Sequence, residues 1–427
     1  MVGSAEVIDR YSKYIMKSVS DPLVLTGGEG VYLIDNHGKR YLDFSTGFSV
    51  MALGYGNRRV ADSMVAQIGK LVHCCYYQYY SIAASLLAEK LSEILGAGLK
   101  KTLFCNSGTE AVEGTMRLAR KHTKRHEIVA LFRSHHGRSM GAATLTGNWK
   151  EKNGMGPYVP GIVHAPAPYC YRCSLRQTYR ECGIACAEFI NDLIDHATSN
   201  DVGCLFIEPV MTDVVIVPPD EYFEKIRRIC KERELLLVVD EVQTGFGRTG
   251  KAFAFQHWNL KPDIAILGKA MGGGLPLGAY VATETVSSSF EYLDFGSTSG
   301  GNAVACAAGL EMIKTIEDHG LIEQTKTVAD DFIRRLIELG RKHSSVGEVR
   351  GKGFIMGVEL VRDQKTKEPA YKEALEMKNY LRENGLLVVL NESTLRILPP
   401  LTAEQQHVDS AVKLIDKSLE RIERRLQ

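Results

Sequence analysis

Short apolar runs alternate with amphipathic segments through the middle of the chain. "KTLFCN" precedes the helix-like "GTEAVEGTMRLARKH", "VGCLFIEP" precedes "DEYFEKIRRICKERE", and "LLLVVDE" and "KPDIAILG" follow. Runs that are apolar throughout and separated by helices are typical of buried strands in a mostly parallel sheet. The pattern therefore predicts an α/β domain over residues 66–325.

The two ends of the chain show a different pattern. Near the N-terminus, "GGEGVYLIDNHGKRYLDFS" alternates strand-like stretches with glycine and Asn-His-Gly turn signals. The C-terminal part offers "GFIMGVELV", "LLVVLNESTLRILPP" and a charged closing helix. We predict a smaller α+β domain built from both termini, with residues 1–65 giving its first part and residues 326–427 its second.

Length and charge narrow the class of protein. A chain of 427 residues is too long for one simple core. The 52 basic and 51 acidic side chains balance, so no nucleic acid or anionic membrane is expected as a partner. No apolar run reaches membrane-spanning length, and the N-terminus lacks the pattern of a secretion signal. We therefore expect a cytoplasmic enzyme.

Two ionisable residues follow neighbouring predicted strands. Asp240 ends the apolar run "LLLVVD", and Lys269 comes one residue after "DIAIL" in a glycine-rich stretch. The carboxyl ends of such strands are where α/β proteins bind ligands, so both charges are expected in one crevice. Taken singly, an aspartate that caps a helix or a solvated surface lysine would explain each residue.

A third element lies between a predicted strand and a predicted helix. Ser107, Gly108 and Thr109 in "CNSGTEAVEG" occupy the helix start, where free backbone N–H groups and the helix dipole favour an anion such as phosphate. Plain helix capping by serine or threonine gives the same sequence pattern.

The glycine-rich stretch around Lys269 matches neither of two common nucleotide-binding motifs. A Walker loop needs glycine where Asp263 stands and serine or threonine where Ala270 stands. A dinucleotide fingerprint needs a helix where Pro276 interrupts the chain. Neither motif is therefore expected.

A lysine, an aspartate and a phosphate cradle together match the needs of pyridoxal 5'-phosphate (PLP). The lysine forms a Schiff base with the aldehyde, and the aspartate keeps the pyridine nitrogen protonated. The glycines after Lys269 allow close approach of the backbone. We therefore predict a PLP enzyme.

Five motifs resemble one family over nearly the whole chain. They are "SGTEAVE", "IEP", "VVDEVQTGFGRTG", "PDIAILGKAMGGGLPLGA" and "STSGGNAVACAAG". In order and spacing they closely resemble the class III, or omega-type, PLP-dependent aminotransferases of fold type I. The resemblance implies a large domain with a mostly parallel sheet of the seven-stranded type, a smaller α+β domain, and an obligate homodimer with shared active sites.

The resemblance also assigns roles to residues. It implies that Lys269 is the Schiff-base lysine and proton shuttle, that Asp240 pairs with the pyridine nitrogen, and that Gln243 contacts the ring phenolate. The remaining implied cofactor contacts are Ser107, Gly108 and Thr109 at the phosphate, Thr298 from a second subunit, and Glu208, His135 and His136 near the ring. His135 occupies the place of the usual stacking aromatic residue.

Three residues concern the substrate. Arg396 in "TLRILPPLT" matches the arginine that grips an α-carboxylate, a task suited to a planar bidentate donor. Arg138 is either a surface arginine or the residue that holds the distal carboxylate of substrates such as γ-aminobutyrate. Asp213 replaces the family's glutamate that masks the arginine when an ω-amine binds. Either Asp213 still reaches Arg396, or the arginine stays permanently available.

Four cysteines form a separate cluster in "PYCYRCSLRQTYRECGIACAE". Cys170, Cys173, Cys182 and Cys186 give the ligand number of a structural zinc site, although not the spacing of a standard finger. Disulfides or four reduced thiols are the alternatives. We assign no metal to them.

The predicted reaction is transamination, in which an ω-amino acid or alanine-type donor passes its amino group to a 2-oxo acid. An amino-acid racemase or a dialkylglycine-type decarboxylase on the same fold is the alternative, because both use the same lysine and aspartate. A cofactor-binding scaffold without activity is the third possibility.

Overall fold

A seven-stranded sheet forms the centre of the computed structural model, which describes residues 3–17 and 19–426. The strand order is β4-β10-β9-β8-β7-β5-β6. The strands are β4 (Leu99–Cys105), β5 (Glu127–Leu131), β6 (Ile162–Ala165), β7 (Val202–Ile207), β8 (Leu236–Asp240), β9 (Ile264–Leu267) and β10 (Gly278–Thr283). Strands β5 to β9 pair in parallel, whereas β10 is antiparallel to both neighbours. The predicted mostly parallel sheet is confirmed.

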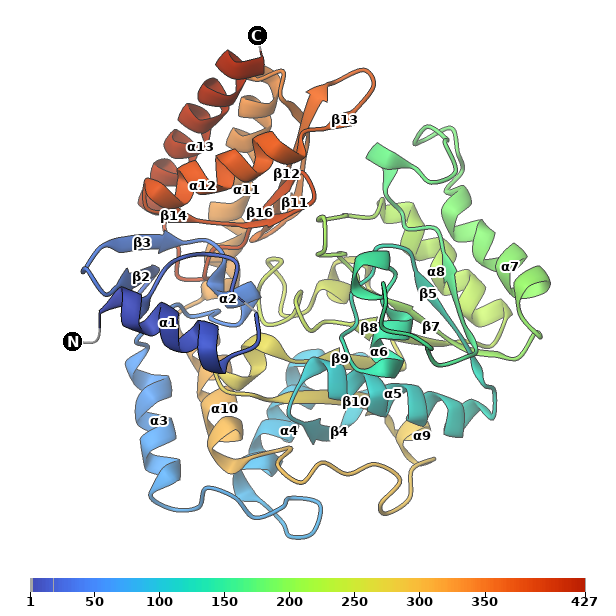
Figure 1. The fold of residues 1–427 in the computed structure, drawn as a ribbon. Coiled ribbons are helices and arrows are strands. Elements are labelled where there is room, and N and C mark those ends of the chain that lie inside the picture. The colour runs from blue at the N-terminus through green and yellow to red at the C-terminus, as the bar shows by residue number, and fades with distance from the viewer. Residues whose placement is uncertain (1–2, 18, 427) are drawn as a thin grey trace.

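Helices cover both faces of this sheet (Figure 1). They include α4 (Ile82–Leu95), α5 (Gly108–Thr123), α7 (Ala185–Ala197), α8 (Asp220–Glu232) and α10 (Ala303–Asp318). Successive residues of β8 pack into different clusters: Val238 joins the one that contains Val112 of α5, and Val239 joins the one that contains Phe223 of α8. Side chains alternate across a sheet, so a strand buried on both faces is apolar throughout, as the sequence of β8 is.

The smaller part of the fold combines both ends of the chain, as predicted. One sheet has the order β1-β2-β3-β14 and the other β11-β12-β16-β15, with β13 paired to β12. These strands are β1 (Leu25–Glu29), β2 (Tyr32–Asp35), β3 (Arg40–Asp43), β11 (Val346–Lys352), β12 (Ile355–Asp363), β13 (Glu368–Pro369), β14 (Leu386–Leu387), β15 (Val389–Asn391) and β16 (Thr394–Ile397). Strand β14 pairs in parallel with β3 and thereby joins the two termini.

Two helices, α11 (Leu321–Lys342) and α12 (Tyr371–Glu383), pack with these strands, and α13 (Gln405–Leu426) packs against both helices. The domain limits after residues 65 and 325 fall inside α3 (Arg58–Ile68) and α11, and the division itself stays a prediction. The shorter elements are α1 (Ser4–Tyr14), α2 (Thr46–Ser49), α6 (Met140–Leu145), α9 (Glu284–Ser287) and the 3-10 turns η1 (Trp149–Glu151), η2 (Cys170–Arg172), η3 (Ala254–Trp258) and η4 (Lys269–Gly272).

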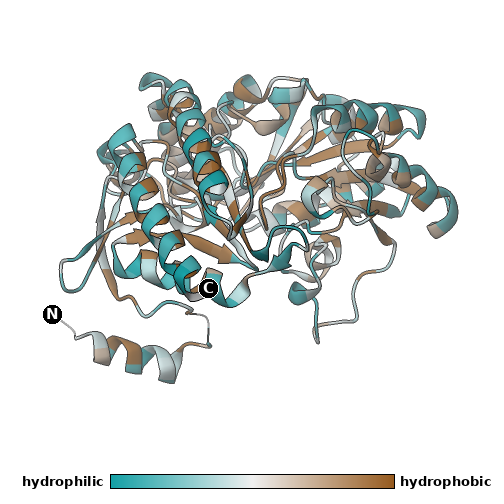
Figure 2. Cartoon of the chain, turned by 90° about the horizontal axis from the view of Figure 1, so that it is seen from above, coloured by the Kyte–Doolittle hydropathy of each residue, from teal (hydrophilic) through white to brown (hydrophobic). Residues whose placement is uncertain are grey.

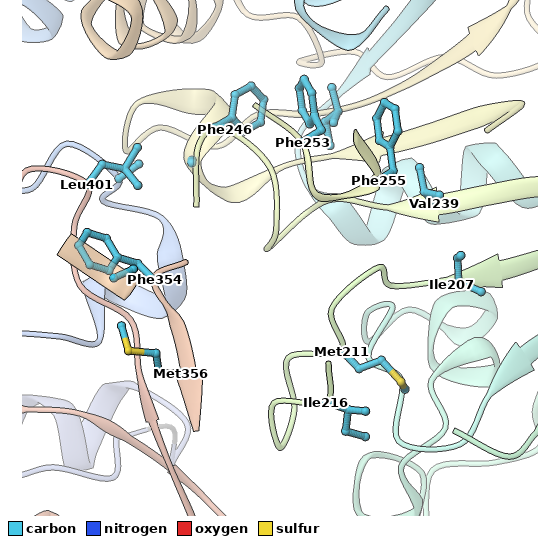
Figure 3. Packing of buried hydrophobic residues seen from close by; sticks show 14 of the residues in the cluster. Ile207, Met211, Ile216, Val239, Phe246, Phe253, Phe255, Phe354, Met356 and Leu401 are labelled. Atoms are coloured by element: carbon cyan, nitrogen blue, oxygen red, sulfur yellow. The ribbon is translucent and has the colours of Figure 1, made fainter. Parts of the chain in front are cut away.

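The two parts share one hydrophobic core. Phe246 and Phe253, which follow β8, belong to the same cluster of buried residues as Phe354 and Leu401 from the C-terminal part (Figure 3). Burial of such side chains stabilises the fold by about 1.5–3 kcal/mol each. The core therefore fixes the C-terminal part against the carboxyl ends of the central strands.

The N-terminal helix α1 stands apart from this core. None of its residues is buried, and the helix projects from the body of the molecule (Figure 2). No helix in the described part of the chain is long and apolar enough to cross a membrane.

Candidate active site

Lys269 lies at the carboxyl end of β9, at the start of η4. Its backbone has a φ of 47°, in the left-handed region that is uncommon for residues other than glycine. The Nζ atom donates to Oε1 of Gln243 over 3.0 Å. Burial lowers the pKa of the amine to about 8, so a larger share of Lys269 is neutral near neutral pH than of an ordinary lysine.

Asp240 ends the neighbouring strand β8, and its Cα pairs with that of Ile266 in β9. Its Oδ1 accepts a hydrogen bond from the backbone of Val242 over 3.0 Å, and its Oδ2 lies 2.8 Å from Nδ1 of His136. Burial acts to lower the pKa of His136, but the hydrogen bond and charge of Asp240 outweigh it, so the pKa is raised. The aspartate and lysine therefore meet at adjacent strand ends, as predicted from the sequence.

A chain of hydrogen bonds connects the lysine to a buried carboxyl group. Thr212 Oγ1 donates to Oε1 of Gln243 over 2.9 Å, and the backbone N–H of Thr212 donates to Glu208 over 3.3 Å. Glu208 also accepts from the backbone of His135 over 2.8 Å. Burial raises the pKa of Glu208 to about 7. Thr212 belongs to none of the motifs identified in the sequence. Only its hydrogen bonds to Gln243 and Glu208 show that it links these two residues.

The expected phosphate cradle opens α5. The Oγ of Ser107 accepts from the N–H of Glu110 over 3.1 Å, so this hydroxyl caps the helix. A Cβ added at Gly278 would lie 2.2 Å from the carbonyl oxygen of Ser107, and one added at Gly108 would lie 2.8 Å from Val242. Glycines thus allow the loop before α5 to pack closely against the ends of β9 and β10. Backbone N–H groups at such a helix start suit a phosphate.

His135 stands next to this network. Burial, with the charges of Arg138 and Lys269, lowers the pKa of its imidazole to about 4. The ring is therefore neutral near neutral pH and would not repel a protonated pyridine ring beside it. Stacking of His135 on a cofactor stays a prediction.

The predicted substrate residues lie around one cleft of about 890 Å³ between the two parts of the chain. Arg138, Asp213 and Arg396 all line it, together with Phe48 and Met51. Arg138 donates to both carboxylate oxygens of Glu151, over 2.9 and 3.0 Å. The structure thus brings the predicted substrate residues together, although Arg138 already has an acidic partner. Thr298, expected to act across a dimer, is exposed on the surface of the single chain.

The four clustered cysteines surround a different and much smaller cavity. Cys170, Cys173, Cys182 and Cys186 line a space of about 20 Å³ that shares no lining residue with the cleft. All four are free thiols, and burial followed by the neighbouring thiols raises the pKa of Cys186 to about 12. Among residues 3–17 and 19–426, no group of three or more metal-ligating side chains is placed to hold an ion.

Comparison with known proteins gives the family. The model of the class III aminotransferases matches residues 14–419. A leucine/methionine racemase of Thermococcus litoralis is 34% identical over 98% of this chain and 96% of the relative. An acetylornithine aminotransferase of Methanocaldococcus jannaschii is 33% identical over 96% of this chain and 97% of the relative. The solved omega transaminase of Pseudomonas jessenii in complex with PMP has a TM-score of 0.94 and 27% identity, and the match covers 98% of both chains.

The chain belongs to the class III aminotransferase family, which is PLP-dependent, and its fold is that of fold type I. The protein is an aminotransferase: it moves an amino group from an amino acid to a 2-oxo acid.

Proposed function

We propose that this aminotransferase binds PLP at the ends of β8 and β9 and transfers the amino group of an α-amino acid to a 2-oxo acid. The observation that carries the proposal is the meeting of Lys269 and Asp240 at adjacent strand ends, with Gln243 bonded to the lysine. Of the two donor classes predicted from the sequence, the alanine-type donor is the better supported, because Arg396 lines the cleft without an ion pair and suits an α-carboxylate.

The residues present fit PLP. The loop around Gly108 offers a helix start with packing too tight for any Cβ, as a phosphate cradle needs. Asp240 provides a buried carboxylate for a ring nitrogen, and Lys269 provides the amine for the aldehyde carbon. Ser107, Gly108 and Thr109 would hold the phosphate, and Gln243 would lie beside the ring oxygen.

When bound, PLP supplies a sink for the electron pair that is left when the substrate's Cα loses its proton. The neutral Nζ of Lys269 takes that proton, and its lowered pKa makes the neutral form available. His136 holds Oδ2 of Asp240, so the carboxylate keeps one orientation during the reaction. The bonds of Thr212 to Gln243 and Glu208 hold Gln243 in place beside Lys269.

A homodimer is part of the proposal. Large apolar side chains are exposed at the start of α4 and before it, with Tyr80 at 107% and Ile82 at 80% relative exposure, and also at Tyr292 with 74%. Large apolar side chains exposed close together in the chain, as Tyr80 and Ile82 are, commonly mark an interface between proteins. A second subunit on this surface would cover them and bring a partner's loop near Thr298 to each site.

Transfer of ¹⁵N from a labelled amino acid to a 2-oxo acid tests the proposed transamination. Holoenzyme is incubated with ¹⁵N-labelled L-alanine and unlabelled 2-oxoglutarate, and the products are read by mass spectrometry. The proposal predicts ¹⁵N in glutamate and equal formation of pyruvate. Loss of optical rotation of alanine without labelled glutamate would instead show a racemase.

A further inference from the structure

Five cationic side chains line the cleft, and four of them already have acidic partners. Arg138 pairs with Glu151 over 2.9 Å, and Lys150 pairs with Glu392 over 3.7 Å. The remaining two pairs join Lys378 and Arg382 to Asp21, each over 2.8 Å. Only Arg396, among the described residues that line the cleft, has no such pair.

Arg396 is buried and forms no close ion pair among the described residues. It lies on β16 with 6% relative exposure, and its Nε makes no hydrogen bond within the described chain. Burial lowers the pKa of Arg396 although the charges of Asp213 and Glu208 act to raise it, so the cost of desolvating the guanidinium is only partly offset. The geometry of this side chain therefore suits an anion that arrives in the cleft.

Asp213 is hydrogen-bonded to two asparagines. Asn148 Nδ2 donates to Oδ2 of Asp213 over 2.8 Å, and Asn391 Nδ2 donates to both the backbone oxygen and Oδ1, over 3.0 and 2.5 Å. The Oδ1 of Asn148 accepts from the N–H of Lys150 over 3.1 Å, which fixes the orientation of its amide. Both oxygens of the Asp213 carboxylate are thus engaged by the asparagines, and Arg396 acts on Asp213 only through its charge, which lowers the pKa of the carboxyl against the larger effect of burial.

The loop that contains Asp213 is itself closed and tied down. Met211 and Ile216 exchange two backbone hydrogen bonds of 3.0 and 2.7 Å. Arg350 donates to the backbone oxygens of Val214, over 2.6 Å, and of Val215. Val215 has a φ of 54°, a conformation that a β-branched residue keeps only when its surroundings enforce it. A shift of the whole loop toward Arg396 would have to break these backbone bonds, whereas a rotation of the Asp213 side chain alone would have to break only its bonds to Asn148 and Asn391.

Apolar side chains also line the cleft. Phe48, Val50, Met51, Leu387 and Leu390 contribute to its lining. We infer that Arg396 is permanently available and that the substrates are α-amino acids and 2-oxo acids with one carboxylate and an apolar side chain. This inference rests on the proposed function, since it names the substrates of the same site.

The first experiment compares substrates on the wild-type holoenzyme. L-leucine, 3-methylbutylamine (the same skeleton without the carboxylate), γ-aminobutyrate and L-glutamate are each given with pyruvate, and kcat/KM is measured. We expect L-leucine to exceed the amine, γ-aminobutyrate and L-glutamate by about 100-fold or more. Comparable values for L-leucine and γ-aminobutyrate would overturn the inference while leaving transamination intact.

The second experiment measures binding and needs no turnover. Calorimetric titration of the holoenzyme with 4-methylpentanoate reports the carboxylate site directly. Releasing Asp213 in the Asn148→Ala/Asn391→Ala double variant should weaken this binding by about tenfold, because the freed carboxylate then competes for Arg396. Asn153→Ala, an exposed asparagine close to Asn148 in the chain, should bind like the wild type.

The two experiments distinguish a failure of the inference about Arg396 from a failure of the proposed transamination. Equal binding of 4-methylpentanoate by the double variant and the wild type would show that Asp213 is not restrained by the asparagines, and would overturn the inference. Binding that responds as expected in an enzyme that aminates no 2-oxo acid would support Arg396 as the receptor and reject the proposed function.

Discussion

Nδ1 of His136 lies 2.8 Å from Oδ2 of Asp240, and both residues are buried. His136→Phe would leave a carboxylate oxygen without its partner, and a hydrogen bond to a charged group contributes about 1.5–3 kcal/mol. We predict a fall in kcat/KM of about 10- to 100-fold. His136→Asn, which keeps a donor near the position of Nδ1, should recover part of the loss.

Steady-state kinetics with matched thermal melts check this prediction. His196→Phe, on the exposed side of α7, serves as the control and should change neither kcat/KM nor the melting temperature. Equal activity of His136→Phe and the wild type would show that Asp240 needs no support from the imidazole.

The capture of PLP by the apoprotein should depend on pH through Lys269. The neutral amine is the nucleophile, so the rate rises as pH increases through the pKa of Lys269, which burial lowers to about 8. Arg396→Met removes a charge that lowers this pKa, so the midpoint should move up; Asp240→Asn removes a charge that raises it, so the midpoint should move down.

Stopped-flow absorbance over a range of pH values follows the capture. Arg228→Met on the exposed face of α8 removes a distant charge and should leave the midpoint in place. A midpoint near the ordinary lysine value of 10.5 would contradict the burial of the amine.

A methyl group at Gly278 should disturb the phosphate cradle. The added Cβ would lie 2.2 Å from the carbonyl oxygen of Ser107, so the loop or β10 must shift. We predict that Gly278→Ala destabilises the fold by about 1–3 kcal/mol and weakens PLP binding. Denaturant unfolding and PLP titration measure the two effects. In Gly69→Ala the nearest atom lies at 3.7 Å, so this control should match the wild type.

A charge on the exposed apolar surface should prevent dimer formation. Ile82→Asp places a carboxylate where we propose that a partner subunit packs, and an unpaired buried charge is strongly unfavourable. Light scattering should then report the 47.3 kDa monomer in place of a dimer. Tyr371→Asp on α12, where the side chain is 53% exposed, should remain dimeric. A dimeric Ile82→Asp protein would place the interface elsewhere.

The sequence predicted the strand ends well because their signal is local. The uninterrupted apolar runs of β8 and β9 identify them as buried strands, and the parallel pairing then places Asp240 beside the strand that precedes Lys269. The motif at Ser107 was also located, although the pattern could not separate a cap from an anion site. The structure shows the cap in place.

The surroundings of Asp213 could not be predicted in the same way. Asn148 and Asn391 reach it from segments 65 and 178 residues distant in the chain, so their meeting depends on how the two parts of the fold pack. Neither asparagine stands in a recognisable motif. The pairing of Arg138 with Glu151 is likewise a matter of loop geometry between the two residues, which no periodicity encodes.

The most direct test is a half-reaction with the donor alone. Purified holoenzyme is mixed with L-leucine in the absence of any 2-oxo acid, and the 2-oxo acid formed is quantified against the number of active sites. Transamination through Lys269 predicts one equivalent of 4-methyl-2-oxopentanoate per site and none from Lys269→Ala. Conversion of L-leucine to its D-isomer without any 2-oxo acid would contradict the assignment and identify the enzyme as a racemase.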